Sequence, residues 1–523
     1  MRLRFALLSL VLLVGWVLLA YRSQAQTFRT LHNFTGTEGA SPQGGLVLGG
    51  NTLYGVAASG GAGSNGLVFA INTDGSGFTV LHSFSPLSNS TNGDGAGPWY
   101  IASYGGAGGL NPRYSPRLVL AGNTLFGTAP RGGEWGNGTV FAVKTDGTGF
   151  QTLHSFTAGS NYTYLSFIVY TNSDGAGPNG GLVLEGNTLY GTAVGGGAWG
   201  AGTVFALYTN GLNFTNLHSF TRASGYISYI TNSDGYGPND GLVLSGNTLY
   251  GTAYFSGTGG WGTVFAVNTD GMGFQTLVAF PSPQYTELGA DPSSGLVLSG
   301  NRLYGTTAYG GRTSGQYSPG YGTVFAVNTD GTGFAVLHNF PTNSGINFNI
   351  DGDLPCAPLL LSGNTLYGTA SEGGEEGNGT VFAIKTDGSG FTVLHTFSAP
   401  AFLHTFPAGI TNSDGADPYD AGLVMSGNTL YGTAVSGGSS GSGTVFSISF
   451  SPQLSIIQSE ASLNLTWPTN FAGFDYTGYT LQSTTNLVSS VWSTNLPAPV
   501  VINGQYTVTN PISSTQQFFR LSQ

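Results

Sequence analysis

Residues 181–193 read GLVLEGNTLYGTA, and residues 202–220, GTVFALYTNGLNFTNLHSF, follow after a short Gly-rich loop. The runs at 182–184, 188–193, 203–207 and 214–220 are rich in β-branched and aromatic residues and are separated by turn residues, so they predict β-strands. Gly-Asn and Asp-Gly pairs suit the tight turns of hairpins. Four strands joined in this order predict an antiparallel meander.

The same pattern occurs seven times, at intervals of roughly sixty residues, which is within the range of repeat architectures. A lone meander with apolar side chains on both faces cannot bury itself, so neighbouring copies must cover it, as propeller blades do. The Asn of the Gly-Asn pair marks each copy: Asn51, Asn123, Asn187, Asn247, Asn301, Asn364 and Asn428.

The two ends of the repeat array complement one another. The seventh copy stops after its third strand, near residue 449, and a spare fourth strand, TFRTLHNF at residues 27–34, precedes the first copy. Pairing of these ends would satisfy edges that an open solenoid leaves exposed. The sequence therefore predicts an all-β fold, with a seven-bladed β-propeller over residues 27–450. Its blades are four-stranded and antiparallel, and the N-terminal strand closes the last one.

The N-terminus reads as a secretory signal peptide over residues 1–26. Arg2 and Arg4 precede the apolar run 5–20, and small residues flank Gln24 at Ser23 and Ala25. The alternative is an uncleaved N-terminal anchor, because sixteen apolar residues approach the length of a membrane span. We expect cleavage, no later membrane span, and a secreted or outer-surface location.

The composition excludes several classes of function. Charged residues make up 7% of the chain, the net charge is −11, and the Lys and Arg residues are scattered, so a nucleic-acid partner is excluded. The single cysteine, Cys356, excludes an intramolecular disulfide framework. We expect a monomer without cofactor or metal.

An Asp-Gly-x-x-Pro motif recurs in the loops between fourth and first strands. We expect a turn in which the Asp bonds its own backbone and Pro sets the entry to the inner strand. The alternative is one Ca²⁺ site per blade, but one carboxylate falls short of the six to eight oxygens that Ca²⁺ takes. The acids are Asp94, Asp174, Asp234, Asp351 and Asp414, with Glu38 as a weak first copy.

The histidines lie in LHxF motifs, six of them at one equivalent position of successive outer strands, where blade four has Val278. Neighbouring sheets lie about 10 Å apart, too far for these side chains to share a metal ion. Each His alternates with Phe, so we expect structural packing. The residues are His32, His82, His154, His218, His338, His395 and His404.

The loops after second and fourth strands vary in length and emerge at one end of the meander, where loops on a rigid scaffold usually carry function. Aromatic residues gather there in blades two to five. They either plug Gly-rich loops or form a stacking platform, plausible for a glycan. The binding candidates are Trp99, Trp135, Trp199, Trp261, Tyr317 and Tyr321.

Few polar residues precede the inner strands. Arg117, Asp240 and Asp420 are the candidates for a polar site at the mouth of a central channel. Glu372, Glu375 and Glu376 form a small acidic loop in blade six that we expect to be solvated.

The character of the chain changes after residue 453, where the repeat stops and Gly becomes rare. Alternating strands over residues 454–523 predict a small β-sandwich of the fibronectin III-like kind, with Trp467 and Trp492 in its core.

The repeat resembles the GloVer tandem-repeat family, extracytoplasmic proteins of Verrucomicrobia-like bacteria with the pattern GLVLSGNTLYGTA…GTVFAVNTDGTGFTVLHSF. The similarity covers about residues 28–450 and recurs seven times. It implies a surface or secreted β-propeller with anchoring that varies between members, and it implies no defined activity. The tail departs from the family's sorting modes, because it lacks a terminal hydrophobic helix with a basic end.

Three functions remain open. The first is a non-enzymatic binding or scaffold protein that uses the variable loops, with an extracellular glycan or cell-surface component as partner. The second is a polysaccharide lyase or hydrolase with its site at the propeller mouth, which usually needs paired carboxylates. The third is a structural spacer in a surface layer.

Overall fold

The computed structural model describes residues 25–97, 117–164, 167–226, 229–282, 287–311, 320–341, 349–399, 401–402, 410–459, 461–485, 491–494, 496–512 and 517–523. All regular secondary structure in these ranges is β-strand. Residues 1–24 of the predicted signal peptide, and Trp99, Tyr317 and His404, lie outside them. The chain divides into two compact units, a larger one of Arg29–Val424 with Tyr431–Ser447 and a smaller one that includes Ile448–Gln523.

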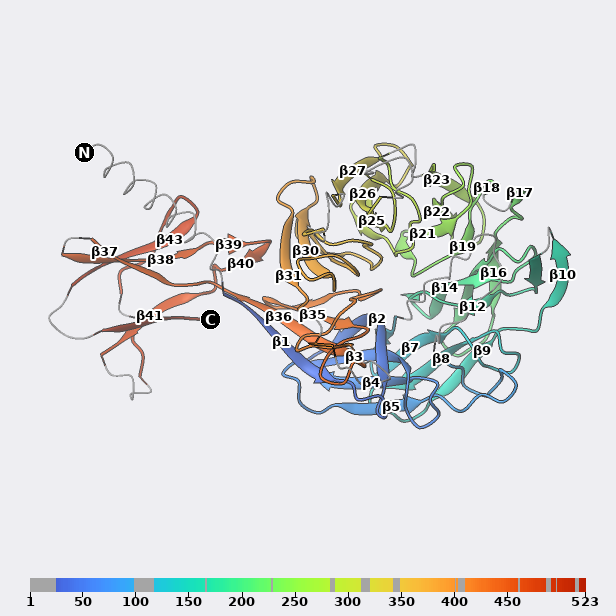
Figure 1. Ribbon diagram of the computed structural model, residues 1–523, viewed down its shortest axis with the longest axis horizontal. Coiled ribbons are helices and arrows are strands. Elements are labelled where there is room, and N and C mark those ends of the chain that lie inside the picture. The colour runs from blue at the N-terminus through green and yellow to red at the C-terminus, as the bar shows by residue number, and fades with distance from the viewer. Residues whose placement is uncertain are drawn as a thin grey trace. The chain divides into compact units, whose positions relative to one another are not determined.

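Seven antiparallel sheets are built on the repeat within the described chain, and we number them in chain order (Figure 1). Sheet 1 consists of β2 (Ala40–Gly49), β3 (Thr52–Ser59), β4 (Leu67–Asn72) and β5 (Thr79–Ser83). Sheet 2 consists of β6 (Val119–Ala121), β7 (Thr124–Ala129), β8 (Thr139–Lys144) and β9 (Gln151–Ser155). Sheet 3 consists of β12 (Ala176–Pro178), β13 (Val183–Glu185), β14 (Thr188–Gly195), β15 (Thr203–Tyr208) and β16 (Thr215–Ser219). Sheet 4 consists of β19 (Tyr236–Pro238), β20 (Val243–Ser245), β21 (Thr248–Phe255), β22 (Thr263–Asn268) and β23 (Gln275–Ala279).

Sheets 3 and 4 have five strands where four were predicted, because the first strand is divided into β12 and β13 in one and into β19 and β20 in the other. The remaining sheets have four strands each. Sheet 5 consists of β24 (Val297–Ser299), β25 (Arg302–Thr307), β26 (Thr323–Asn328) and β27 (Ala335–Asn339). Sheet 6 consists of β28 (Leu360–Ser362), β29 (Thr365–Ala370), β30 (Thr380–Lys385) and β31 (Thr392–Thr396). Sheet 7 consists of β34 (Val424–Ser426), β35 (Thr429–Ala434), β36 (Thr444–Ser451) and β1 (Ala25–Asn33). Three hairpins lie between sheets: β10 (Ser160–Tyr164) with β11 (Phe167–Thr171), β17 (Ser224–Tyr226) with β18 (Tyr229–Thr231), and β32 (Ala401–Phe402) with β33 (Ile410–Thr411).

The Gly-Asn pair makes a two-residue turn between the first two strands of each repeat, as in sheet 1, where Gly49 pairs with Thr52. Gly50, the first residue of that turn, has a φ of 61°, and its six equivalents also have positive φ. Because a positive φ at the first central position is typical of the type II′ turn, Gly is required here and a side chain would be strained.

Successive sheets bury their apolar side chains against one another. Phe84 and Val68 of sheet 1 share a core cluster with Phe141 and Leu125 of sheet 2, and similar clusters join sheets 2 to 6 in order. Hydroxyl groups add a polar link, because Thr192 Oγ1 of sheet 3 donates to the Asp240 carbonyl before sheet 4 at 3.0 Å. The fold is therefore propeller-like.

The predicted pairing of the two chain ends is confirmed. Strand β1 lies beside β36, as the blue and orange strands of Figure 1 show. Phe34 N donates to Gly443 O at 3.0 Å, and Ser439 N donates to Asn33 Oδ1 at 2.9 Å. Phe34 is fully buried in a cluster with Leu53 of sheet 1 and Val445 of sheet 7. Sheet 7 thus packs on sheet 1 in the same way as consecutive sheets pack.

The smaller unit contains its own strands. A four-stranded sheet has the order β37 (Ser455–Ser459), β38 (Ser462–Pro468), β43 (Gln505–Pro511), β42 (Val500–Ile502), and two pairs are β41 (Thr480–Thr484) with β44 (Phe518–Ser522), and β39 (Asn470–Phe471) with β40 (Phe474–Asp475). Trp467 is buried with Leu465 and Val508, as predicted. The core placement of Trp492 is wrong: this side chain is partly buried, outside that cluster, with the Arg520 guanidinium 4.2 Å over its ring.

Candidate functional site

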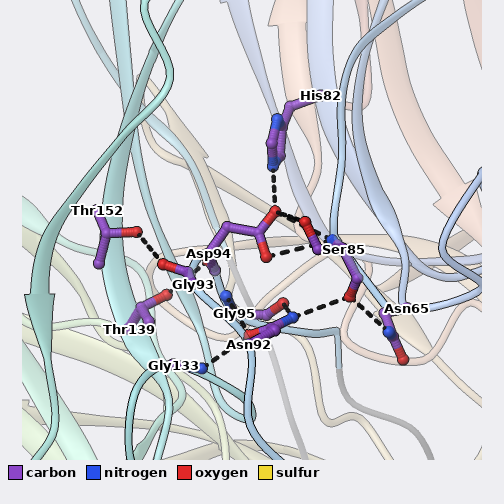
Figure 2. Close-up of polar contacts among 10 residues, drawn as sticks. All are labelled: Asn65, His82, Ser85, Asn92, Gly93, Asp94, Gly95, Gly133, Thr139 and Thr152. Atoms are coloured by element: carbon purple, nitrogen blue, oxygen red, sulfur yellow. Dashed lines mark hydrogen bonds and ion pairs between the residues drawn. The ribbon is translucent and has the colours of Figure 1, made fainter. Parts of the chain in front are cut away.

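The Asp-Gly loop holds the carboxylate of Asp94 in a dense set of hydrogen bonds, shown in Figure 2. His82 Nε2 donates to Asp94 Oδ2 at 3.0 Å. The backbone N–H and the hydroxyl of Ser85 each donate to the same oxygen at 3.0 Å. The acid thus ties the end of β5 to the loop that follows it.

The same arrangement recurs along the repeat. His Nε2 lies 3.0 to 3.2 Å from the acid that follows it in four further copies: His154 and Asp174, His218 and Asp234, His338 and Asp351, His395 and Asp414. In three of them the acid also accepts the backbone N–H that follows the fourth strand, from Thr157, Thr221 and Ser398.

These contacts set the protonation state of the acids. Burial acts to raise the pKa of Asp94, but the hydrogen bonds from His82 and Ser85 outweigh it and hold the pKa below its ordinary value. The pKa values of Asp174 and Asp414 are lowered by the same balance. Each is a stable carboxylate with its oxygens occupied, which argues against one Ca²⁺ site per Asp-Gly loop.

The loop also reaches the next sheet. Thr139 Oγ1 of sheet 2 donates to the Asp94 carbonyl at 3.1 Å, and Thr152 Oγ1 donates to Gly93 O at 2.9 Å. The His82 ring stacks on Phe150 of sheet 2, with ring centroids 3.6 Å apart. Structural packing of the histidines is therefore confirmed, and the described residues contain no group of three His, Cys, Asp or Glu placed to hold a metal.

The predicted role of Asp within its own turn is wrong. Asn92, two residues earlier, makes that turn: its Oδ1 accepts Gly95 N at 2.9 Å and its Nδ2 donates to Gly95 O at 2.6 Å. Asn92 Oδ1 also accepts Gly133 N from sheet 2 at 2.9 Å. Asp94 is left free to bond His82 across the loop.

Sequence reasoning missed the His–Asp contact, although the repeat contains a signal for it. Sheet 4 has Val278 at the His position, and the loop that follows has Leu288 at the Asp position. In the first copy, His32 is paired with Glu38 at 3.7 Å. Joint replacement of the two positions within one chain indicates spatial contact.

The predicted channel-mouth residues do not form an open site. Asp240 is 1% exposed and accepts hydrogen bonds from Gly241 N at 2.6 Å and Gly295 N at 2.7 Å. Burial raises the pKa of Asp240, and the Arg117 charge opposes this rise. Asp420 is equally buried. Neither carboxyl is accessible to a substrate.

Arg117 lies where several sheets approach one another. Gly45 lies within β2 of sheet 1, and a Cβ added to it would lie 2.7 Å from Arg117 Nε. A Cβ added to Gly422, which precedes sheet 7, would lie 2.8 Å from a terminal nitrogen of Arg117. Glycines at these positions let the guanidinium fit between loops. Arg117 therefore lies close to the inner loops of sheets 1 and 7, and its charge acts on Asp240.

The aromatic candidates separate into two groups. Trp135 and Trp199 are 50% and 48% exposed and occupy the same position of the loop between second and third strands in sheets 2 and 3. Trp261 lies two positions later in its loop, where it pairs with Ser256 as Asn137 pairs with Gly132. Trp261 and Tyr321 are partly buried and pack against core clusters.

Sheet 6 carries an acid that sequence reasoning did not single out. Asp353 is 9% exposed, and its Oδ1 has no hydrogen-bond partner in the described chain. Burial, and then the neighbouring Glu372 carboxylate, raise the pKa of Asp353 to about 7. The prediction of a solvated acidic loop is confirmed, because Glu372, Glu375 and Glu376 are all exposed. The buried acid beside Glu372 was not predicted from the sequence.

The Gloeobacter/Verrucomicrobia repeat matches residues 17–171 and 223–401 of the chain. The chain belongs to this repeat family. The resemblance inferred from the recurring GNTLYGTA pattern is confirmed. Among curated proteins, none matches the chain.

Solved structures share only a distant likeness with this member of the repeat family. An oligogalacturonate lyase from Vibrio parahaemolyticus is 10% identical, with a TM-score of 0.43 over 82% of this chain and 98% of the other. A puromycin-hydrolyzing peptidase of Mycobacterium tuberculosis is 11% identical, with a TM-score of 0.42 over 83% and 59%. No helix within the described ranges has the length and apolar character of a membrane span.

Proposed function

We propose that this repeat-family member is an extracytoplasmic binding protein whose seven sheets close into a seven-bladed β-propeller and whose loops hold a glycan. Membership of the repeat family supports an extracellular repeat protein. The observation that carries the binding role is the pair of half-exposed tryptophans, Trp135 and Trp199, at one loop position of adjacent sheets.

The propeller proposal rests on contacts between sheets. Core clusters join sheets 1 to 6 in order, and another joins sheet 7 to sheet 1. Sheets 6 and 7 are linked by the edge-to-face rings of Phe397 and Phe446, with centroids 5.4 Å apart. Every sheet thus has two sheet neighbours, as closure requires. Deletion of residues 27–34 is expected to expose β36 and lower the melting temperature; unchanged unfolding would count against closure.

The tryptophans point to the ligand class. A side chain that is half exposed contributes little to packing here, and its indole offers a flat apolar face with an N–H donor at its edge. The C–H faces of sugar rings are complementary to such a surface. A glycine follows each residue, Gly136 after Trp135 and Gly200 after Trp199. A glycan that spans two neighbouring loops would meet both rings.

Binding is favoured over hydrolysis or elimination at the centre of the sheets. Those reactions need acids that reach the substrate, usually as a pair at a set separation. Asp240 is buried and fully engaged with backbone N–H groups and Arg117, and Asp420 is buried as well. These two acids lack the access that the catalytic role requires.

A glycan array of the secreted protein tests the proposal. We expect at least one class of extracellular polysaccharide to bind, and Trp135→Ala with Trp199→Ala to weaken binding by about tenfold or more, or about 1.4 kcal/mol. Tyr208→Ala is the matched control, because Tyr208 is an exposed aromatic at the opposite end of β15 from Trp199. Binding that survives the double change, or depends equally on Tyr208, would refute the platform.

A further inference from the structure

The loop that enters sheet 6 departs from its equivalents in the other sheets. Asp353 occupies a position where five sheets have alanine and sheet 4 has Tyr236: Ala40, Ala96, Ala176, Ala290 and Ala416. Across the strand pair, Glu372 takes the place of Ser59, Arg131, Gly195, Phe255, Tyr309 and Ser436. Sheet 6 alone therefore places two acids at this pair of positions.

The backbone fixes the two acids opposite one another. Asp353 N donates to Glu372 O at 2.8 Å, and Glu372 N donates to Asp353 O at 3.0 Å. This is a hydrogen-bonded antiparallel pair, whose Cα atoms lie about 5.5 Å apart and whose side chains leave the same face. The two carboxylates are consequently neighbours, and like charges directly opposite are destabilising.

The described residues offer the two acids no ion pair, although the Leu354 backbone N–H donates to the Asp353 carboxylate. Asp353 is more than nine-tenths buried, and its Oδ1 finds no donor there. The described ion pairs in this region involve His338 with Asp351 and not the acid pair. A buried carboxylate with one unpaired oxygen is costly, so a position with a buried acid beside a second acid calls for a counter-charge.

We propose that Asp353 and Glu372 hold a divalent cation, and that Ca²⁺ is the ion that fits. Both ligands are hard oxygens, which select Ca²⁺ or Mg²⁺ over zinc or copper. Two carboxylates supply up to four oxygens if both bind in a bidentate manner, and the exposed side of Glu372 gives water access to the remaining positions. Ca²⁺ tolerates such irregular coordination better than Mg²⁺ does, because Mg²⁺ requires near-octahedral geometry.

The site would be weak. Among the described residues no group of three or more His, Cys, Asp or Glu is placed to hold a metal, so water must complete the coordination. Few charged ligands give dissociation constants of about 10⁻⁴–10⁻³ M, the range of extracellular Ca²⁺ modules. This affinity matches an extracytoplasmic protein and is independent of the glycan proposal, because the site lies in another sheet.

The test uses the full secreted chain, stripped with EDTA and dialysed. Calorimetric titration with CaCl₂ is expected to show one site, and a tenfold excess over the dissociation constant should raise the melting temperature by roughly 1–2 °C. Asp353→Ala and Glu372→Ser should abolish both effects; each introduces the residue that other sheets carry, so folding is expected. Glu376→Ser, an exposed acid of the same loop, should retain them.

Three results would overturn the site. The first is the absence of Ca²⁺ binding to the native chain. The second is equal stabilisation by MgCl₂ or by NaCl at matched ionic strength, which marks general screening of a chain of net charge −11. The third is Ca²⁺ binding that persists in Asp353→Ala.

Discussion

Two equivalent loops of this protein treat an acid in opposite ways. In the loop before sheet 2, Asp94 is surrounded by His82 and Ser85, and its pKa is held below the ordinary value. In the loop before sheet 6, Asp353 is buried beside Glu372 without a donor to Oδ1, and its pKa is raised to about 7. Asp94 links two sheets, whereas Asp353 is expected to destabilise the sheet that contains it.

The two acids differ by two positions in the same motif. Asp94-Gly95-Ala96 aligns with Asp351-Gly352-Asp353, and Asp351 keeps the His contact, at 3.2 Å from His338. A shift of two residues moves a carboxylate from a set of N–H donors to an alanine position. The contrast shows that the donors around an acid, and not its burial alone, decide whether its pKa is lowered or raised.

Removal of Asp94 should have the largest effect. Asp94→Ala leaves the Ser85 N–H and the His82 ring without their acceptor, so we expect a loss of about 2–4 kcal/mol in the free energy of unfolding. Urea unfolding measures it. Asp146→Ala, in an exposed turn, is the control and should change stability much less. If both variants lose the same free energy of unfolding, the hydrogen bonds around Asp94 contribute no more to stability than those of an exposed turn.

The sheet 4 junction offers a natural replacement for the network. His82→Val with Asp94→Leu copies Val278 and Leu288, and the pair should be more stable than Asp94→Leu alone by about 1–2 kcal/mol. The reason is that no histidine is then left without an acceptor. A double-mutant cycle measured by urea unfolding checks this, and simple additivity would contradict direct coupling.

Replacement of Asp353 should act in the opposite direction to replacement of Asp94. In EDTA at pH 8, Asp353→Ala should raise the free energy of unfolding by about 1–3 kcal/mol, because it removes a buried carboxylate that has an unpaired oxygen and lies beside the Glu372 carboxylate. The matched change Ala416→Asp, at the same position of sheet 7, should lower it. If Asp353→Ala instead destabilises the protein in EDTA, a group of the protein stabilises the Asp353 carboxylate, and the contrast with Asp94 fails.

Acid should affect the network through the lowered pKa values of Asp94, Asp174 and Asp414. A carboxyl with a depressed folded pKa contributes stability above its unfolded pKa, about 3.9, and that stability is lost as pH falls through the folded value. The urea midpoint should therefore fall between pH 6 and pH 3. Asp94→Asn should show a smaller fall over the same range, and an unchanged slope would contradict the assignment.

The smallest effect on stability is expected at the exposed tryptophans. Trp135→Ala should change the free energy of unfolding by about 0.5 kcal/mol or less, because half of the side chain already meets water. Trp261→Ala is the contrast and should cost more, since that ring packs against a core cluster. Thermal unfolding of both variants tells whether Trp135 serves the fold or remains available to a ligand.

Much of the fold could be predicted because the repeat states it seven times. The strands of GLVL, TLYGTA and TVFAV lie where the alternation of apolar runs and turns placed them. The pairing of β1 with β36 was also predictable, since a missing strand at one end of the repeats matched a spare strand at the other. The site was harder to predict. Arg117 and Asp240 were named, but the burial of Asp240 and the effect of the Arg117 charge on it depend on loops from different sheets.

The amino-acid sequence alone was sufficient to predict the order of the strands, the number of sheets built on the repeat, and the pairing of residues 27–34 with the last repeat. These features follow from one pattern of strands and turns that recurs at a fixed interval. The state of each acid was decided only in three dimensions. Asp94 and Asp353 are the same residue type in the same motif, yet one meets His82 and the other meets Glu372. A pKa depends on donors and charges within a few ångströms, and in a repeat protein those neighbours come from adjacent strands and sheets that the linear order does not display.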